Sequence, residues 1–200
     1  MIDFLLKHRD EIISLITGLI YLFFSIRQNI WLWPVGILAS VYAIIVFYHS
    51  QLYADMSLNV YYVLVSIYGW YHWLVRKDNA KHSSIKIITL KVRDWIVYLV
   101  IVGVLTIGFA ELLIHVPQKI GIKPSSVPWW DAFLTASSIV ATWMLARKIL
   151  EQWLWWIVID GISIWMLIYK ELYFMAALFV VYTFMAVIGY IEWKKDYQQQ

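Results

Sequence analysis

The chain of 200 residues contains no cysteine, only four prolines and eight glycines, and few charged residues. Without cysteine it can form neither a disulfide framework nor a thiolate metal site. Charged residues make up 14% of the sequence, against about 25% in soluble globular domains. Apolar residues dominate instead, at 62% of the total, and the mean hydropathy is +0.70. This composition is typical of a protein embedded in a lipid bilayer.

Motifs that carry catalysis are also missing. No P-loop, G-x-S-x-G or G-x-G-x-x-G stretch occurs, and the five histidines lack the spacing of metal ligands. We therefore expect no enzymatic activity, no cofactor, no metal site and no nucleotide-driven pumping. The lysines and arginines that raise the isoelectric point to about 8.9 gather in loops between apolar segments. We attribute them to membrane topology and expect no nucleic-acid partner.

Seven apolar segments are long enough to cross a bilayer, which takes roughly 17–25 residues in a helix. The predicted spans are 11–26, 30–48, 52–74, 94–115, 128–146, 152–169 and 172–192. Seven spans place the two termini on opposite sides of the membrane. The loops on the same side as the C terminus carry 11 lysines and arginines, and those on the same side as the N terminus carry 5. The positive-inside rule therefore predicts an outer N terminus and a cytoplasmic C terminus. We expect an all-α polytopic membrane protein with a single membrane domain, residues 1–200.

A pattern of tyrosine, glycine and tryptophan recurs at an offset of 120 residues. Its members are Leu52-Tyr53, Tyr62, Gly69 and Trp73 in the third predicted span, and Leu172-Tyr173, Tyr182, Gly189 and Trp193 in the last. Trp31-Leu32-Trp33 matches Trp153-Leu154-Trp155 at 122, which implies a two-residue insertion. We interpret residues 11–74 and 128–192 as copies joined by a linker helix at 94–115. This is a 3+1+3 parallel repeat related by an axis along the membrane normal, as in SWEET transporters.

One carboxylate, Asp160, lies in the middle of the sixth predicted span. A charge at that depth is costly, so an intramembrane acid is a functional-site hypothesis by default. Trp153 and Trp156 precede it by seven and four residues, which places both indoles on its helix face. An acid beside aromatic rings suits an organic cation. The alternatives are a structural anchor for Asp160 and an interfacial belt position for the tryptophans. The matching part of the second span, near Leu38-Ala39, has no acid.

The third predicted span carries a polar stripe at 4, 3, 4, 3 spacing. Its members are Asp55, Asn59, Tyr62, Ser66 and Gly69. In a membrane such a stripe turns toward a neighbouring helix or a water-filled path. We expect its polar side chains to give hydrogen bonds to a substrate. The alternatives are interhelical contact for Asn59 and plain solvation for Asp55.

Pro34 and Gly36 lie close together near the start of the second predicted span. A proline and a glycine inside a helix favour a kink, and a kink in a transport protein often marks a gate. The pair is therefore a candidate gate, although helix packing alone would also explain both residues.

Two parts of the sequence resemble the PnuC-type bacterial vitamin transporters. The matching runs are Gln51-Leu52-Tyr53-Ala54, Ile67-Tyr68-Gly69-Trp70-Tyr71-x-Trp73, Ser138-Ile139-Val140-Ala141, Arg147-Lys148, Trp153-x-x-Trp156-Ile157 and Ile162-Ser163. The resemblance covers about residues 10–195. It implies a SWEET-like 3+1+3 fold in the bacterial inner membrane and a small-molecule vitamin as substrate. It also implies facilitated diffusion of a cationic vitamin, most often nicotinamide riboside, with a homotrimer as a candidate state.

The resemblance further implies that Trp153, Trp156, Asp160 and Asn59 contact the substrate. Carriers of nicotinamide riboside resemble this chain, but they have Asn at the position of Asp160 and Gln at the position of Asn59. The family also includes transporters of thiamine. Both vitamins are cations whose rings can stack on indole. The sequence therefore leaves nicotinamide riboside and thiamine open, with the site expected at the membrane midplane between the two copies.

Two other classes compete with a transporter. A seven-helix photoreceptor needs a Schiff-base lysine in its last helix, and none lies between Leu172 and Ile191. A seven-helix receptor is the first alternative to a transporter. An ion channel could use Asp160 as a filter acid only in a symmetric oligomer with the sixth helix at the axis.

Overall fold

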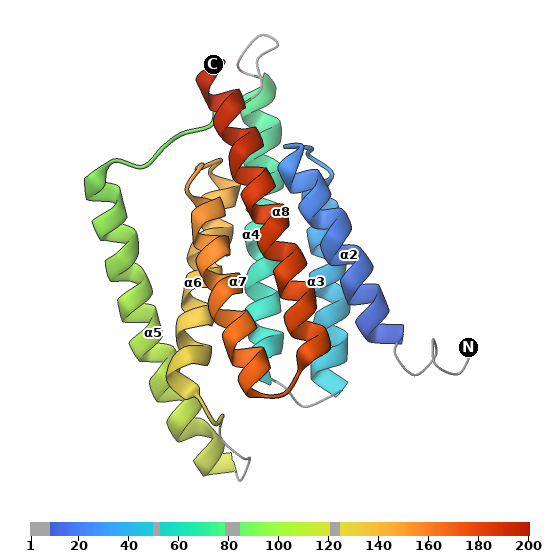
Figure 1. The fold of residues 1–200 in the computed structure, drawn as a ribbon, viewed down its shortest axis with the longest axis vertical. Helices are drawn as coiled ribbons and strands as arrows, with labels where there is room; N and C mark the ends of the chain where they lie inside the picture. The colour runs from blue at the N-terminus through green and yellow to red at the C-terminus, as the bar shows by residue number, and fades with distance from the viewer. Residues whose placement is uncertain (1–8, 50–52, 79–84, 121–124) are drawn as a thin grey trace. The chain divides into compact units, whose positions relative to one another are not determined.

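A computed structural model of the chain describes residues 9–49, 53–78, 85–120 and 125–200. Within these ranges the chain is helical almost throughout (Figure 1). The helices are α2 (Arg9–Ile26), α3 (Leu32–His49), α4 (Tyr53–Asp78), α5 (Val92–Ile120), α6 (Pro128–Ala146), α7 (Gln152–Tyr169) and α8 (Tyr173–Gln198). Each predicted span corresponds to one of these helices, which confirms the all-α prediction. Gln51 and Leu52, which carry part of the resemblance, lie outside the described residues.

The predicted ends differ most where a helix continues beyond its apolar part. We predicted an end at 115 for α5 and at 192 for α8, whereas the helices reach Ile120 and Gln198. Hydropathy marks only the stretch that can lie in hydrocarbon, and a helix can continue past it into polar sequence. Among the described helices, α3, α5, α7 and α8 are long and apolar enough to span a bilayer.

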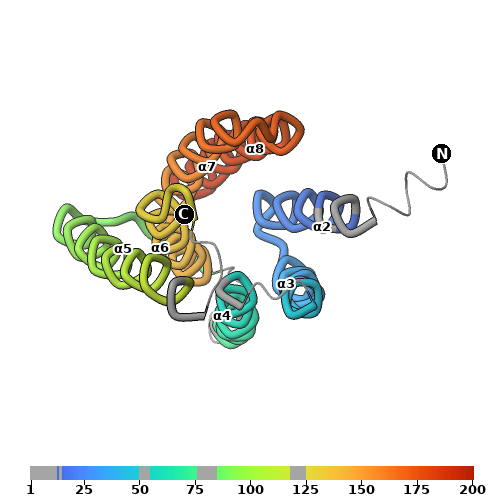
Figure 2. Tube along the Cα trace, turned by 90° about the horizontal axis from the view of Figure 1, so that it is seen from below, coloured from blue at the N-terminus to red at the C-terminus, as the bar shows by residue number. Residues whose placement is uncertain are grey.

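The helices fall into two compact units, which we call unit 1 (Met1–Ile85) and unit 2 (Lys86–Gln200). In unit 1, α3 packs against both α2 and α4. In unit 2, α6 packs against α5 and α7, and α7 pairs with α8, as Figure 2 shows in a view along the helices. The predicted linker helix, α5, therefore belongs to unit 2, where it packs against α6.

In unit 1 a buried tryptophan joins α3 to α4. The Trp33 ring lies so close to Gly69 that a Cβ added to this glycine would overlap it. The same ring meets Trp73 edge to face, with ring centroids 5.3 Å apart and an interplanar angle of 90°. This geometry is favourable for two aromatic rings. Gly69 is therefore a packing residue, because it lets the backbone of α4 approach the indole of α3.

Unit 2 contains the same contact between α7 and α8. Trp153 is 1% exposed, and a Cβ on Gly189 would lie 2.6 Å from its ring. Trp153 also meets Trp193 edge to face, with centroids 5.7 Å apart and planes at 86°. Each of the three residues follows its partner in unit 1 by 120 positions. The predicted match of the tryptophans at 122 is therefore wrong, because Trp153 has the role of Trp33 and not that of Trp31.

The turns that lead into these two tryptophan-bearing helices also agree at an offset of 120. Gln28 has a φ of 50° and donates to Ser25 O at 3.1 Å, and Asn29 donates to Phe24 O at 2.9 Å. This is the Schellman arrangement that closes a helix. At the end of α6, Lys148 has a φ of 56°, and the corresponding bonds are Lys148 N to Leu145 O and Ile149 N to Met144 O, both 3.0 Å.

One end of unit 2 is tied together by backbone hydrogen bonds. Ile88 N donates to Lys148 O at 3.1 Å, and Leu150 N donates to Ile88 O at 2.9 Å. Ile87 N donates to the Gln200 side chain at 2.9 Å. The segment before α5, the turn between α6 and α7, and the end of α8 thus lie together. Burial in this turn lowers the pKa of Lys148 to about 8, although the nearby Asp196 acts in the opposite direction.

The contact between Trp153 and Gly189 predicts a clear difference between two glycine substitutions. Gly189→Ala should destabilise the protein by about 1–3 kcal/mol, because the added methyl group overlaps the indole. Gly103→Ala in α5 should stabilise it by roughly 0.5–1 kcal/mol, because nothing lies within 4 Å of the added group and alanine favours a helix. Thermal unfolding in detergent, followed by tryptophan fluorescence, measures both. Equal stability of the two variants would contradict the packing described here.

Candidate functional site

Asp160 is a buried acid in the middle of α7. The residue is 5% exposed, and among the described residues none donates a hydrogen bond or offers an ion pair to its carboxylate. Its helix is otherwise almost entirely apolar. The hydroxyl of Tyr182 in α8 lies within electrostatic range of the carboxylate. A buried charge without a counter-charge is expensive, so this position favours a positively charged ligand.

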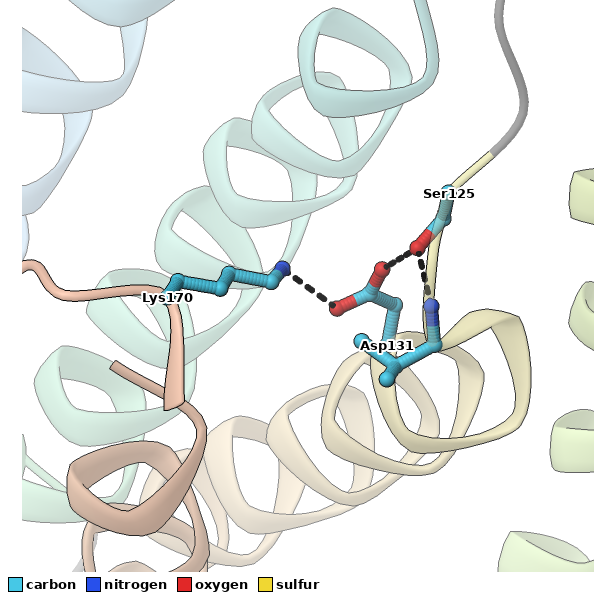
Figure 3. Close-up of polar contacts among 4 residues, drawn as sticks. Ser125, Asp131 and Lys170 are labelled. Atoms are coloured by element: carbon cyan, nitrogen blue, oxygen red, sulfur yellow. Dashed lines mark hydrogen bonds and ion pairs between the residues drawn. The ribbon is translucent and has the colours of Figure 1, made fainter. Parts of the chain in front are cut away.

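Asp131, at the start of α6, is an acid of the same unit that has both an ion-pair partner and a hydrogen-bond partner (Figure 3). Its Oδ1 lies 3.7 Å from the ammonium group of Lys170, at the end of α7. Its other oxygen accepts a hydrogen bond from the Ser125 hydroxyl, whose oxygen in turn accepts from Val127 N at 3.1 Å. Asp131 is also partly exposed. It therefore ties two helix ends together, and Asp160 has none of these partners.

The two predicted tryptophans of the site differ in what they can offer a ligand. Trp153 is fully buried by Gly189 and Trp193, so in this structure it has no free ring face for stacking. Its position in the packed interior of unit 2 is not that of an interfacial belt, and its predicted contact with the substrate stays a prediction. Trp156 is only partly buried and packs against the core formed by α5, α6 and α7. Of the two indoles, Trp156 is the more exposed.

The predicted polar stripe of α4 belongs to unit 1, and its members lie in different surroundings. Ser66 is buried, and Tyr62 lies half-buried within electrostatic range of Tyr21 in α2. The Asn59 side chain donates to Asp55 O, one turn earlier, at 2.9 Å. Asp55 is exposed. The amide nitrogen of Asn59 is thus satisfied within its own helix, and a role of this stripe in substrate contact stays a prediction.

The candidate gate residues lie in a packed part of unit 1. Pro34 falls in the first turn of α3, where a proline removes no helical hydrogen bond, and the helix continues without interruption to His49. The position gives no reason for the predicted kink. A Cβ on Gly36 would lie 2.9 Å from the Tyr21 ring and 3.3 Å from Ser66 Oγ. Gly36 therefore allows α2 and α4 to approach α3.

The corrected offset changes the counterpart of Asp160. At 120 residues it is Ser40, which is buried, and not Leu38-Ala39. Unit 1 still has no acid at this position, so the charge belongs to one unit only.

The structure also reveals Gln152, which the sequence reasoning missed. It is fully buried at the start of α7, and neither polar atom of its amide has a hydrogen-bond partner among the described residues. Its spacing of eight residues from Asp160, which places both on one helix face, was the available signal.

Comparison with known proteins supports the resemblance seen in the sequence. The family model for the nicotinamide mononucleotide transporter matches residues 10–195. The nicotinamide riboside transporter PnuC of Escherichia coli is 27% identical over 201 residues, covering 92% of this chain and 84% of the relative. The riboflavin/roseoflavin transporter RibM of Streptomyces davaonensis is 27% identical over 186 residues, with the same coverage.

A third relative, the nicotinamide riboside transporter PnuC of Neisseria mucosa, is 28% identical over 194 residues, covering 92% of this chain and 71% of the relative. Among solved structures, the crystal structure of the vitamin B3 transporter PnuC matches with a TM-score of 0.73 and 26% identity. That match covers 98% of this chain and 85% of the other. The chain therefore belongs to the nicotinamide mononucleotide transporter family, as a membrane transporter of the PnuC type.

Proposed function

We propose that this chain takes up nicotinamide riboside by facilitated diffusion across the bacterial cytoplasmic membrane. The observation that carries the proposal is the buried Asp160 carboxylate, which has no counter-charge among the described residues. The pyridinium ring of nicotinamide riboside is a permanent cation and would neutralise this charge. Relatives from Escherichia coli and Neisseria mucosa are named for the same substrate.

Two aromatic side chains of unit 2 would complete the ring-binding part of the site. Trp156 precedes Asp160 by one helical turn and is only partly buried, so its indole can stack on a cationic ring. Tyr182 of α8 lies within electrostatic range of Asp160 and can donate a hydrogen bond from its hydroxyl. Asn59 and Tyr62 of α4 stay predicted contributors from unit 1.

The charge of each candidate substrate determines how well it would bind next to the Asp160 carboxylate. Thiamine shares the positive charge, so Asp160 alone does not separate it from nicotinamide riboside, and the names of the relatives favour the riboside. Riboflavin, the substrate in the name of one relative, has a neutral ring and gains nothing from a buried carboxylate. Nicotinamide mononucleotide, which gives the family its name, adds a phosphate that the same carboxylate would repel.

We also propose that the two units contain the 3+1+3 parallel repeat, with the site at the membrane midplane. The recurrence of the tryptophan, glycine and tryptophan contact at an offset of 120 supports it, since three matching residues make the same contacts in each unit. The distribution of basic residues supports an outer N terminus and a cytoplasmic C terminus.

A charge test uses nicotinamide riboside and its reduced dihydro form, which has the same shape but no charge. We expect the wild type to bind the cation at least about tenfold more tightly, a difference of about 1.4 kcal/mol. Asp160→Asn should lose most of this preference while still binding, because an amide can hydrogen-bond but carries no charge. Asp131→Asn is the matched control and should keep the preference. Isothermal titration calorimetry measures all three, and a preference unchanged in Asp160→Asn would contradict the proposed site.

A substrate test compares the four vitamins in parallel on the wild type. Quenching of intrinsic tryptophan fluorescence should give saturable binding of nicotinamide riboside at the lowest concentration. Thiamine should follow, with riboflavin and nicotinamide mononucleotide at least about tenfold weaker because neither brings a net positive charge. Riboflavin as the tightest ligand would replace the proposed substrate, and binding of none of the four would overturn a vitamin-binding role.

The absence of cysteine makes the orientation directly testable by single-cysteine labelling. Glu171→Cys, in the exposed turn between α7 and α8, should react with a membrane-impermeant maleimide in intact cells. Gln199→Cys, after α8, should react only once the membrane is permeabilised. The reverse pattern would show that the chain has the opposite orientation.

A further inference from the structure

Gln152 presents a buried amide that the described protein does not satisfy. It is the first residue of α7, its side chain is fully buried, and both Nε2 and Oε1 lack a hydrogen-bond partner. A buried polar group left unpaired costs roughly 1–3 kcal/mol. Such groups in native proteins are normally paired with protein, water or a ligand. A hydroxyl group suits this amide best, because it can accept from Nε2 and donate to Oε1.

The position of Gln152 relates it to the acid of the site. Gln152, Trp156 and Asp160 follow one another at intervals of four residues, which places them on one face of α7. At a rise of 1.5 Å per residue, Gln152 lies about 12 Å from Asp160 along the helix axis. The turn between α6 and α7, next to Gln152, lies at the same end of unit 2 as the C terminus. The two unsatisfied polar side chains therefore lie on either side of Trp156.

The matching position in unit 1 shows that packing does not require an amide here. At the offset of 120 residues Gln152 corresponds to Leu32, which is also fully buried. Both residues directly precede the tryptophan that lies on a glycine. The indole nitrogens of Trp33 and Trp153 are both unpaired, so they do not distinguish the two units. The amide, like the acid at position 160, is a polar feature of unit 2 alone.

We propose that Gln152 is a specificity-determining residue that binds a hydroxyl of the substrate's sugar chain. This inference rests on the proposed function and extends it from the charged ring to the rest of the molecule. The pyridinium ring lies at Asp160 and Trp156, and the ribose extends along α7 toward Gln152. Nicotinamide riboside and riboflavin, which occur in the names of the relatives, both carry a hydroxylated five-carbon group on a ring nitrogen, a ribose in the first and a ribityl chain in the second. Gln152 thus binds a hydroxyl of the five-carbon group that these two vitamins share.

The test compares nicotinamide riboside with N-methylnicotinamide methylated on the ring nitrogen (1-methylnicotinamide), which keeps the cationic ring and lacks the ribose. Gln152→Leu should weaken binding of the riboside about tenfold, since one hydrogen bond to the substrate is lost. Binding of N-methylnicotinamide should stay the same within about twofold. The melting temperature should rise, because two unpaired polar atoms leave the interior and unit 1 already holds leucine at this position. Calorimetry and thermal unfolding in detergent give the two readouts.

Thr106→Val is the matched control, because it removes a different buried polar group, a hydroxyl on α5 that has no partner among the described residues. It should raise the melting temperature and leave both ligands unaffected. Gln152→Met provides an unbranched second variant without hydrogen-bonding groups, in case leucine does not fit. Unchanged riboside binding in both Gln152 variants would overturn the inference and show that the amide holds only water. Failure of the wild type to bind either ligand would instead overturn the proposed function.

Discussion

A tryptophan ring lying on a glycine is the contact on which both units depend. In unit 2 it joins the first turn of α7 to α8, because Gly189 leaves no Cβ between the α8 backbone and Trp153. Once this ring is fixed, the rotation of α7 about its own axis is fixed as well. Asp160, two turns further along, then lies on the buried side of the helix and within range of Tyr182. The proposed site is thus positioned by a packing contact at the end of its own helix.

The polar groups of unit 2 divide into those with partners and those without. Asp131 has an ammonium group and a hydroxyl beside it, and the Ser163 hydroxyl donates to Ile159 O at 2.8 Å. Within the described ranges Asp160 and Gln152 make no such bonds, although both are more deeply buried than Asp131. Other buried polar atoms of unit 2 also lack a partner in the described part of the chain, such as the Thr106 hydroxyl, but Asp160 and Gln152 share one face of α7 with Trp156. A cationic ring with a hydroxylated chain matches both groups at once.

Hydropathy alone predicted every described helix, because a span must be apolar along its whole length. The acid at position 160 was also recognisable, since its depth follows from the length of the span. The packing of Trp153 was not recognisable from the sequence. Tryptophans at the membrane interface, in a binding site and in a packed core look alike in a sequence, and only the structure shows that Trp153 lies against Gly189. The match of Trp31-Leu32-Trp33 to Trp153-Leu154-Trp155 at an offset of 122 residues rested on similar letters in the sequence. The tryptophan–glycine contacts in the structure recur at an offset of 120 residues. Gln152 escaped notice because burial at a helix end depends on how the turn before it folds.

The central claim is that Asp160 is held unpaired to receive the positive charge of the substrate. A structure of the protein with bound nicotinamide riboside tests it most directly. We expect the pyridinium ring within about 4–6 Å of the Asp160 carboxylate, the range in which an opposite charge acts on it. The ring should also lie against Trp156, with the ribose directed toward Gln152. A ring bound away from Asp160, with that carboxylate still unpaired, would contradict the account.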